Sequence, residues 1–334
     1  MRKTWVFLLF SLTAQAQVSF IPGNLRTAFN RAASVHKPVF IEVYSPTCHV
    51  CESFVPVFNK PSVGKFYNDR FVSYRLDINS QEAQGFLAKQ GLIVPSLPLF
   101  LFYDENVRLL HAQNLNNTEK EVTGTGSKAL NPAERASGYK DRFAKGDRAA
   151  AFLSEYSLYT RIVRDTVSNI QVMNAYAKSI RPVEYVSAFP LIKKALLDAE
   201  NPLFTYFVTH LEEYRKKNAP ADVKQAGESV IMATLYSSRG NQMSSDRISK
   251  VASYLLLLGF DRKTMENRSL LPELNALFRE RKTLQAMTRV DRYLQTTQPG
   301  LDEYLYLSNY LPARSSDPLV LRKAAELKAR AQKK

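Results

Sequence analysis

The sequence predicts two domains of different class, an α/β domain followed by an all-α domain. A chain of 334 residues is too long for one small domain and long enough for two. Strand-like and helix-like runs alternate from Lys37 to about His111, whereas the later residues carry apolar side chains at helical spacing. Eight of the twelve glycines precede Asp147. We therefore predict one domain over 17–146 and a second over 147–334.

The composition is that of a globular protein. Hydrophobic residues make up 45% of the chain and charged residues 23%, so the chain can bury a core and wholesale disorder is excluded. Lys and Arg outnumber Asp and Glu by 15. Such a surplus would suggest binding to a polyanion if nothing in the sequence indicated where the protein resides.

The first 16 residues have the pattern of a secretory signal peptide. Arg2 and Lys3 form a basic start, an apolar stretch covers 5–14, and Ala14-Gln15-Ala16 is an A-x-A cleavage site. The alternatives are a buried N-terminal helix and a membrane anchor, but the apolar run is well short of the roughly 20 residues that span a bilayer. We expect export to the periplasm or the exterior, cleavage after Ala16, and no nucleic acid among the partners.

Local patterns predict each element of the first domain. A continuous apolar run with one acid predicts a strand over 39–44, and helical spacing predicts a helix over 50–59. Alternation predicts a strand over 71–78, and Ser80 is the expected N-cap of a helix that ends at 90. A strand at 99–103 turns at 104–106 into another at 107–110. We expect a loop over 112–131, where Gly, Asn and Thr gather, and a last helix over 132–145.

The second domain is predicted to be entirely helical. Five prolines stand where helices should start or connect: Pro182, Pro202, Pro220, Pro299 and Pro318. Stacked helical hairpins and a compact bundle both fit the pattern, which contains no known repeat signature. Helical spacing is found over 151–159, 183–199, 203–214, 221–237, 248–258, 271–294 and 319–331.

The chain has two cysteines, Cys48 and Cys51, at the predicted junction of a strand and a helix. A loop this short removes little entropy from the unfolded chain, so the pair points to chemistry more than to stability. The helix N-terminus would favour a thiolate at Cys48, and Cys51 lies one turn further on, within reach of a disulfide. Half of a zinc site is an alternative, but the four histidines show no metal-ligand spacing. A pair of cysteines without any chemical role is a further alternative.

Several neighbouring residues resemble a thioredoxin-fold active site. Glu42 lies six residues before the first cysteine, where that fold usually has a buried acid, and Pro56 lies five residues after the second, where it often has a helix-kinking proline. The stretch 94–102 resembles the one that holds the cis-proline of the fold, with Pro98 as that residue and Pro95 as the weaker candidate. The segment 59–77 resembles an exported thioredoxin-like branch. The resemblance covers about 20–146 and implies a central mixed sheet flanked by helices.

The resemblance also implies catalytic roles. Cys48 would attack a partner disulfide, or deliver its own, and Cys51 would resolve the mixed disulfide, so the redox-active disulfide would need no further cofactor and no metal. Glu42 would exchange a proton with Cys51, because a desolvated carboxylate titrates near neutrality. The alternative for Glu42 is an edge carboxylate paired with a lysine.

The remaining implied roles concern the substrate. A cis peptide at Pro98 would expose the backbone of Leu97 to an extended substrate peptide. Thr47 stands where thioredoxins usually have tryptophan, which puts thioredoxin-like efficiency in protein reduction in doubt. His49 would stabilise the Cys48 thiolate, or it would be a solvent-exposed side chain of small effect. The direction of electron flow stays open.

We therefore expect an exported thiol-disulfide oxidoreductase whose substrates are protein thiols and disulfides, with a membrane or envelope redox partner. A copper-binding protein of thioredoxin fold is one alternative, with His111 as a distant third ligand. Such proteins typically space the cysteines one residue further apart, which counts against it. The second alternative is a redox-inactive scaffold or interaction protein. The basic tail over 322–334 would contact an anionic envelope surface, unless it is only a solvated helix face.

Overall fold

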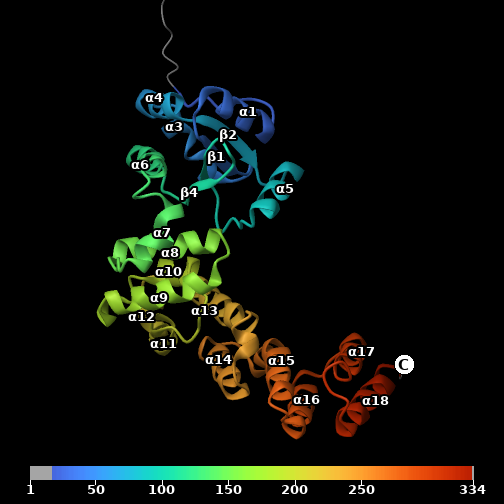
Figure 1. Ribbon diagram of the computed structural model, residues 1–334. Coiled ribbons are helices and arrows are strands. Elements are labelled where there is room, and N and C mark those ends of the chain that lie inside the picture. The colour runs from blue at the N-terminus through green and yellow to red at the C-terminus, as the bar shows by residue number, and fades with distance from the viewer. Residues whose placement is uncertain (1–16, 333–334) are drawn as a thin grey trace, which may run out of the picture. The chain divides into compact units, whose positions relative to one another are not determined.

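The computed structural model describes residues 17–332, which divide into two compact units (Figure 1). Unit 1 comprises 17–148 and 158–168, and unit 2 comprises 149–157 and 169–332. The signal peptide predicted over 1–16 lies outside the described residues. Within 17–332, no helix has both the length and the apolar character that crossing a membrane requires.

A four-stranded mixed sheet forms the centre of unit 1. The strand order is β2-β1-β3-β4, in which β1 runs parallel to β2 and antiparallel to β3, and β4 runs antiparallel to β3. This sheet with flanking helices is a thioredoxin fold, as the sequence predicts. The strands are β1 (Val39–Tyr44), β2 (Val72–Asp77), β3 (Leu99–Tyr103) and β4 (Leu109–Gln113).

The helices of unit 1 begin at recognisable caps. The side chain of Asn24 accepts the N–H of Thr27, and Ser80 accepts the N–H of Ala83 at the start of the predicted helix. The helices are α1 (Leu25–Val35), α2 (His49–Glu52), α3 (Val55–Phe58), α4 (Pro61–Arg70), α5 (Gln81–Gln90), α6 (Glu119–Leu130) and α7 (Tyr139–Ala144), with a 3-10 turn η1 (Ala136–Gly138).

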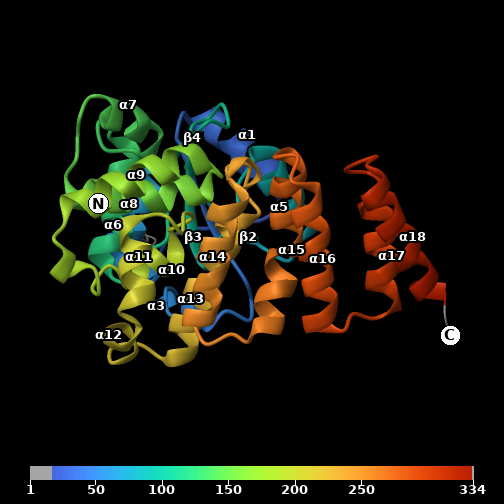
Figure 2. The same cartoon turned by 90° about the horizontal axis from the view of Figure 1, so that it is seen from below.

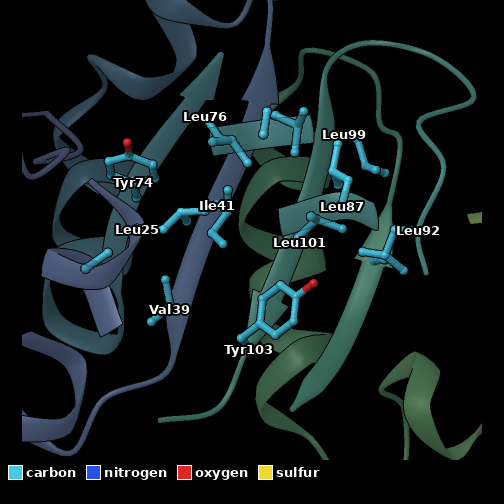
Figure 3. Packing of buried hydrophobic residues seen from close by; sticks show 14 of the residues in the cluster. Leu25, Val39, Ile41, Tyr74, Leu76, Leu87, Leu92, Leu99, Leu101 and Tyr103 are labelled. Atoms are coloured by element: carbon cyan, nitrogen blue, oxygen red, sulfur yellow. The ribbon is translucent and has the colours of Figure 1, made fainter. Parts of the chain in front are cut away.

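Side chains alternate along β1, so successive residues enter different cores on the two faces of the sheet. Val39 and Ile41 pack with residues of α1 and α5 in an aliphatic cluster (Figure 3). Phe40 enters an aromatic cluster on the other face, where its ring centroid lies 5.1 Å from that of Phe100. Glu42, two residues after Phe40, points to the same face of the sheet and is fully buried. The fold therefore buries one carboxyl group on the face of the sheet that carries the aromatic cluster.

The predicted helix over 50–59 is two short helices, α2 and α3. Pro56 has no N–H to donate to the carbonyl of Glu52, so the hydrogen-bond ladder breaks there. Ser53 and Phe54 between the two helices keep right-handed helical dihedral angles. The chain therefore continues in the same direction across the break.

The prediction of a loop over 112–131 is wrong, because β4 continues to Gln113 and α6 occupies Glu119–Leu130. Thr118 caps α6 by accepting the N–H of Glu121. Gly126 lies in the helix where α6 packs on α4, and a Cβ atom there would meet the Phe66 ring at 2.6 Å. The glycine that suggested a loop is thus a site of close packing. The helix predicted over 132–145 is reduced to η1 and α7.

The segment 17–21 joins the outer edge of β2 at Ser73. The N–H of Ile21 donates to the carbonyl of Ser73 at 2.9 Å, and Phe20 forms a parallel bridge with the same residue. The side chain of Asn68 holds the start of this segment, accepting from the N–H of Ser19 and donating to the carbonyl of Gln17. The segment therefore covers the start of this strand edge.

The rest of the described chain is helical, as predicted, but several boundaries differ. Two helices were not predicted, α9 and α17, and the predicted helix over 183–199 contains only η2 and α10. The elements are α8 (Ala150–Ile162), α9 (Thr166–Ser179), η2 (Pro182–Glu184), α10 (Phe189–Lys194), α11 (Pro202–Thr209), α12 (Leu211–Arg215), α13 (Pro220–Leu235), η3 (Gly240–Gln242), α14 (Ser245–Leu257), α15 (Arg262–Arg279), α16 (Thr283–Thr297), α17 (Leu301–Tyr310) and α18 (Pro318–Gln332).

Within unit 2, neighbouring helices pack in chain order. α13 packs on α14, α14 on α15 and α15 on α16, and α17 packs on α18 (Figure 2). α18 also contacts α16. Pro182, Pro202, Pro220 and Pro318 each occupy the first position of an element, as their placement in the sequence predicts. This serial packing is that of stacked helical hairpins.

A buried ion network joins α15 to α16. Arg289 of α16 pairs with Glu266 at 2.6 Å and with Glu273, both on α15, and all three side chains are almost fully buried. Its guanidinium also donates to the hydroxyl of Ser269 at 3.0 Å. Removing either partner of such a pair would leave an uncompensated buried charge, so the network favours one register of the two helices.

Two glycines of α6 should respond to alanine in opposite directions. A Cβ atom added at Gly124 would meet no other atom within 4 Å, so Gly124→Ala should stabilise unit 1 by about 0.5–1 kcal/mol through helix propensity. Gly126→Ala should instead destabilise it by about 1–3 kcal/mol, because the new methyl group meets Phe66. Urea denaturation of both variants measures this, and equal effects would contradict the packing of α6 on α4.

Candidate active site around Cys48 and Cys51

The two cysteines lie where β1 gives way to α2. The chain turns after Tyr44, and the N–H of Cys48 donates to the carbonyl of Ser45 at 3.1 Å. Cys48 is the N-cap of α2, and its sulfur accepts the N–H of Cys51 at 3.1 Å. A backbone N–H directed at this sulfur favours its thiolate form when the pair is reduced.

Cys48 and Cys51 form a disulfide, with their Cα atoms 5.2 Å apart. The two residues differ in exposure, since Cys51 is 1% exposed whereas Cys48 is partly exposed. A protein partner can therefore approach the sulfur of Cys48 and not that of Cys51. This asymmetry suits an attacking residue at the first position and a resolving residue at the second.

Glu42 lies on the same face of β1 as the aromatic cluster. Its Oε2 accepts a hydrogen bond from Nε of Arg75 at 2.7 Å, while its Oε1 makes no hydrogen bond among the described residues. Burial raises the pKa of Glu42 to about 7, and the nearby Arg75 guanidinium opposes that rise. The carboxyl group can therefore gain and lose a proton near neutral pH. Glu42 is therefore not an edge carboxylate paired with a lysine: it is a buried carboxyl group paired with an arginine.

Arg75 is a component of the site that the sequence did not reveal. It is the register partner of Glu42 on β2, and its guanidinium stacks over the Tyr44 ring at 4.1 Å. Alternation along β2 places Arg75 on the face opposite Tyr74, but its pairing with Glu42 depends on the β1–β2 register, which the sequence does not show. Arg75 also lines a pocket of about 300 Å³ with Phe20, Val55, Phe58 and Asn59. Solvent therefore reaches the guanidinium side of the pair.

The peptide bond between Leu97 and Pro98 is cis, at the position that the resemblance implied, whereas Pro95 is not preceded by a cis bond. Leu97 is half-buried and Pro98 is buried. The side chain of Asn114 donates hydrogen bonds to carbonyl groups of this loop. No sequence signal pointed to Asn114, which lies in the segment predicted as a loop.

Thr47 and His49 lie at the exposed rim of the site. The hydroxyl of Thr47 is 3.1 Å from that of Ser45, which also accepts a hydrogen bond from Asn79 at 3.3 Å. The side chain of His49 is 95% exposed, and its Nδ1 lies 3.4 Å from the carboxylate of Glu52. The structure thus places the imidazole in solvent, beside an acid.

His111 is enclosed on β4 and uses both of its ring nitrogens. Its Nδ1 accepts the N–H of Ala136 at 3.0 Å, and its Nε2 lies 3.2 Å from Oε1 of Gln113. A ring nitrogen that is already bonded is a poor third ligand for copper, which counts against that alternative. Over residues 17–332, no three side chains of His, Cys, Asp and Glu gather as a metal site would require.

No family model and no curated protein sequence matches the chain. Solved structures similar to it include a solution structure of a protein from Bacteroides thetaiotaomicron proposed to be a disulphide isomerase, which is 20% identical, with a TM-score of 0.31, over 35% of this chain and 96% of that one. A disulphide isomerase from Xylella fastidiosa Temecula1 is 11% identical over 31% and 77%, with a TM-score of 0.24. DsbH oxidoreductase is 15% identical over 38% and 94%, with a TM-score of 0.30.

Proposed function

We propose that this protein is a thiol-disulfide oxidoreductase that exchanges disulfides with protein partners. The observation that carries the proposal is the Cys48–Cys51 disulfide at the start of α2, with the first cysteine accessible and the second buried. A disulfide kept for stability alone would not need this asymmetry, and so short a loop stabilises little.

The proposed reaction is two successive thiol-disulfide exchanges. In the reduced protein, the Cys48 thiolate attacks one sulfur of a partner disulfide, forms a mixed disulfide and releases the other partner sulfur as a thiolate. The Cys51 thiolate then attacks the Cys48 sulfur, which releases the second partner sulfur and forms the Cys48–Cys51 disulfide. Two electrons pass from this pair to the partner. The reverse sequence oxidises a partner dithiol.

Glu42 is proposed as the proton acceptor for Cys51. The buried thiol of Cys51 must lose its proton before it can resolve the mixed disulfide, and burial in apolar surroundings disfavours a free thiolate. A carboxyl group with a pKa of about 7 is half-ionised near neutral pH, so it can take up that proton and return it. Arg75 would keep enough of the carboxyl group ionised to act as a base.

Location and partners belong to the same proposal. The pattern over 1–16 supports export to the periplasm or the exterior, which is a compartment where disulfides persist. The partners would be proteins with thiols or disulfides, and a membrane or envelope protein would recycle the pair. The helical unit 2 would bind or position a partner, with its basic C-terminal residues near an anionic envelope surface.

The two cysteines should be separable by substitution. Cys51→Ser should leave Cys48 able to attack but unable to be released, so the variant should accumulate mixed disulfides with its partners. Cys48→Ser should form none. Non-reducing electrophoresis of both variants, after acid quenching and alkylation in the natural host, measures the difference.

For the wild-type protein, we would measure the reduction potential of the Cys48–Cys51 pair by equilibration in glutathione buffers. A potential near that of thioredoxin would indicate a reductant or isomerase, and a much more oxidising one a disulfide donor. If the pair does not cycle at all, or if Cys48→Ser traps partners as well as Cys51→Ser does, the oxidoreductase proposal is wrong.

Glu42 should make the stability of the protein depend on pH. Its pKa is about 7 in the folded state and about 4.5 in the unfolded state, so between those values the folded state binds more protons. Stability should therefore fall as the pH rises through that window, by about 3 kcal/mol, and then level off. Glu42→Gln should remove this slope and be more stable than the wild type at pH 8. Denaturant unfolding of the oxidised protein at pH 5 and pH 8 measures it.

The same substitution should slow resolution of the mixed disulfide, because an amide cannot accept the proton of Cys51. An exposed acid of unit 1, Glu134, offers the matched control, and Glu134→Gln should change neither the slope nor the rate. A Glu42→Gln variant with wild-type pH dependence in both measurements would refute the proposed role of the carboxyl group.

A further inference from the structure

The segment that follows β4 reaches both loops of the candidate active site. Asn114 donates hydrogen bonds to the loop that contains Pro98, and Asn117 donates to the carbonyl of Ser53, just after α2, at 3.2 Å. Leu115 between them packs on the aromatic cluster. Asn116 instead bonds to Glu121 at the start of α6. Two of these asparagine side chains thus face the site and a third faces away from it.

The Asn114 amide holds the two carbonyl groups on either side of Leu97. Its Nδ2 lies 2.8 Å from the carbonyl oxygen of Ser96 and 2.7 Å from that of Pro98. An amide nitrogen has two hydrogens, so it can donate one to each carbonyl group. Over residues 17–332, no hydrogen bond in the structure uses the N–H or the C=O of Leu97. Both backbone groups of Leu97 are therefore available between the two carbonyl groups that Asn114 holds.

The position of Asn114 follows from the pairing of β4 with β3. Phe100 of β3 pairs with Gln113 of β4, so Asn114 comes next in register, beside the residue at which β3 begins. Its side chain continues the contact between the two strands into the loop, where backbone pairing has ended. Asn114 is partly buried, so water has only limited access to compete for these hydrogen bonds.

We infer that Asn114 is a positioning residue for substrate binding, which holds Ser96, Leu97 and Pro98 so that the N–H and C=O of Leu97 can pair with an extended peptide. The inference rests on the proposed function, in which a partner disulfide meets Cys48. The ligand is an extended protein segment recognised mainly through its own backbone. Such recognition accepts many sequences.

Preorganisation explains which substrates should depend on Asn114. A loop that is already fixed loses little conformational entropy when a peptide pairs with it, whereas a loop without Asn114 would have to be ordered during binding. A small disulfide makes no backbone pairing, so its reaction with Cys48 gains nothing from the fixed loop. Asn114 should therefore affect protein substrates and not the chemistry at the sulfur atoms.

The test compares a protein disulfide with a small one. The reduced full-length protein is mixed with insulin or with glutathione disulfide, and the rate of its oxidation is measured against substrate concentration. For Asn114→Ala, the half-saturating concentration of insulin should rise about tenfold, equivalent to about 1.4 kcal/mol, while the maximal rate stays within about twofold. Its rate with glutathione disulfide and its reduction potential should match the wild type.

Two further variants sharpen the test. Asn114→Asp keeps the shape of the side chain but turns a carboxylate oxygen toward two carbonyl oxygens, so its effect on insulin should be at least as large. Asn116→Ala removes a neighbouring amide side chain that bonds only to Glu121 among the described residues, and it should behave as the wild type does. If Asn114→Asp does not fold, Asn114→Ala decides, because water can then reach the freed carbonyl groups.

The outcomes separate this inference from the proposed function. An unchanged half-saturating concentration for insulin in Asn114→Ala would overturn the inference, and so would a parallel loss with both disulfides. If the wild type oxidises with neither disulfide, the proposed function fails instead. NMR order parameters of the backbone amides of Ser96 and Leu97 would then decide the positioning role: lower values in Asn114→Ala and not in Asn116→Ala would support it, and equal values would refute it.

Discussion

The position of β1 between β2 and β3 determines where every group of the candidate active site lies. Because β1 is buried on both faces, its side chains must be apolar or individually paired, and Glu42 is the ionisable exception. The parallel register with β2 places Arg75 beside it. The same strand ends at Tyr44 and delivers Cys48 to the first turn of α2. A change of one residue in this register would turn Glu42 into the aliphatic cluster and separate it from Arg75.

The site contains one destabilising group, the buried carboxyl group of Glu42, and several polar side chains that hold the surrounding loops in place. A fully buried carboxyl group is unfavourable in its charged form, and only one of its oxygens is bonded. Around it, uncharged polar side chains from separate elements fix the loops: Ser45 with Asn79, Asn114 with the Pro98 loop, and Asn117 with Ser53. Hydrogen bonds of this kind hold loop backbones without adding charge near the cysteines.

The sequence predicted the elements that depend on local pattern and missed those that depend on packing. β1 and β3 have the predicted bounds because continuous apolar runs have few other stable positions. The sequence predicts a loop where α6 lies because Gly124, Gly126 and several Asn and Thr residues are typical of loops, whereas the missing side chain of Gly126 makes room for Phe66. The cysteine spacing predicted the location of the disulfide. Arg75 and Asn114 could not be found, because their partners are set by strand register and by a backbone that only the fold brings near.

The segment over 17–21 has a consequence for association between molecules. An outer strand with unpaired backbone groups is a template for a strand from another copy, and proteins generally protect such edges. Here the protection of β2 is supplied by five residues at the start of the described chain, held by Asn68 and by the bond from Ile21 to Ser73. A chain that began after these residues would lose the pairing at Ser73 and leave more of the β2 edge open to another strand. We expect such a shortened chain to self-associate more readily through added β-strands.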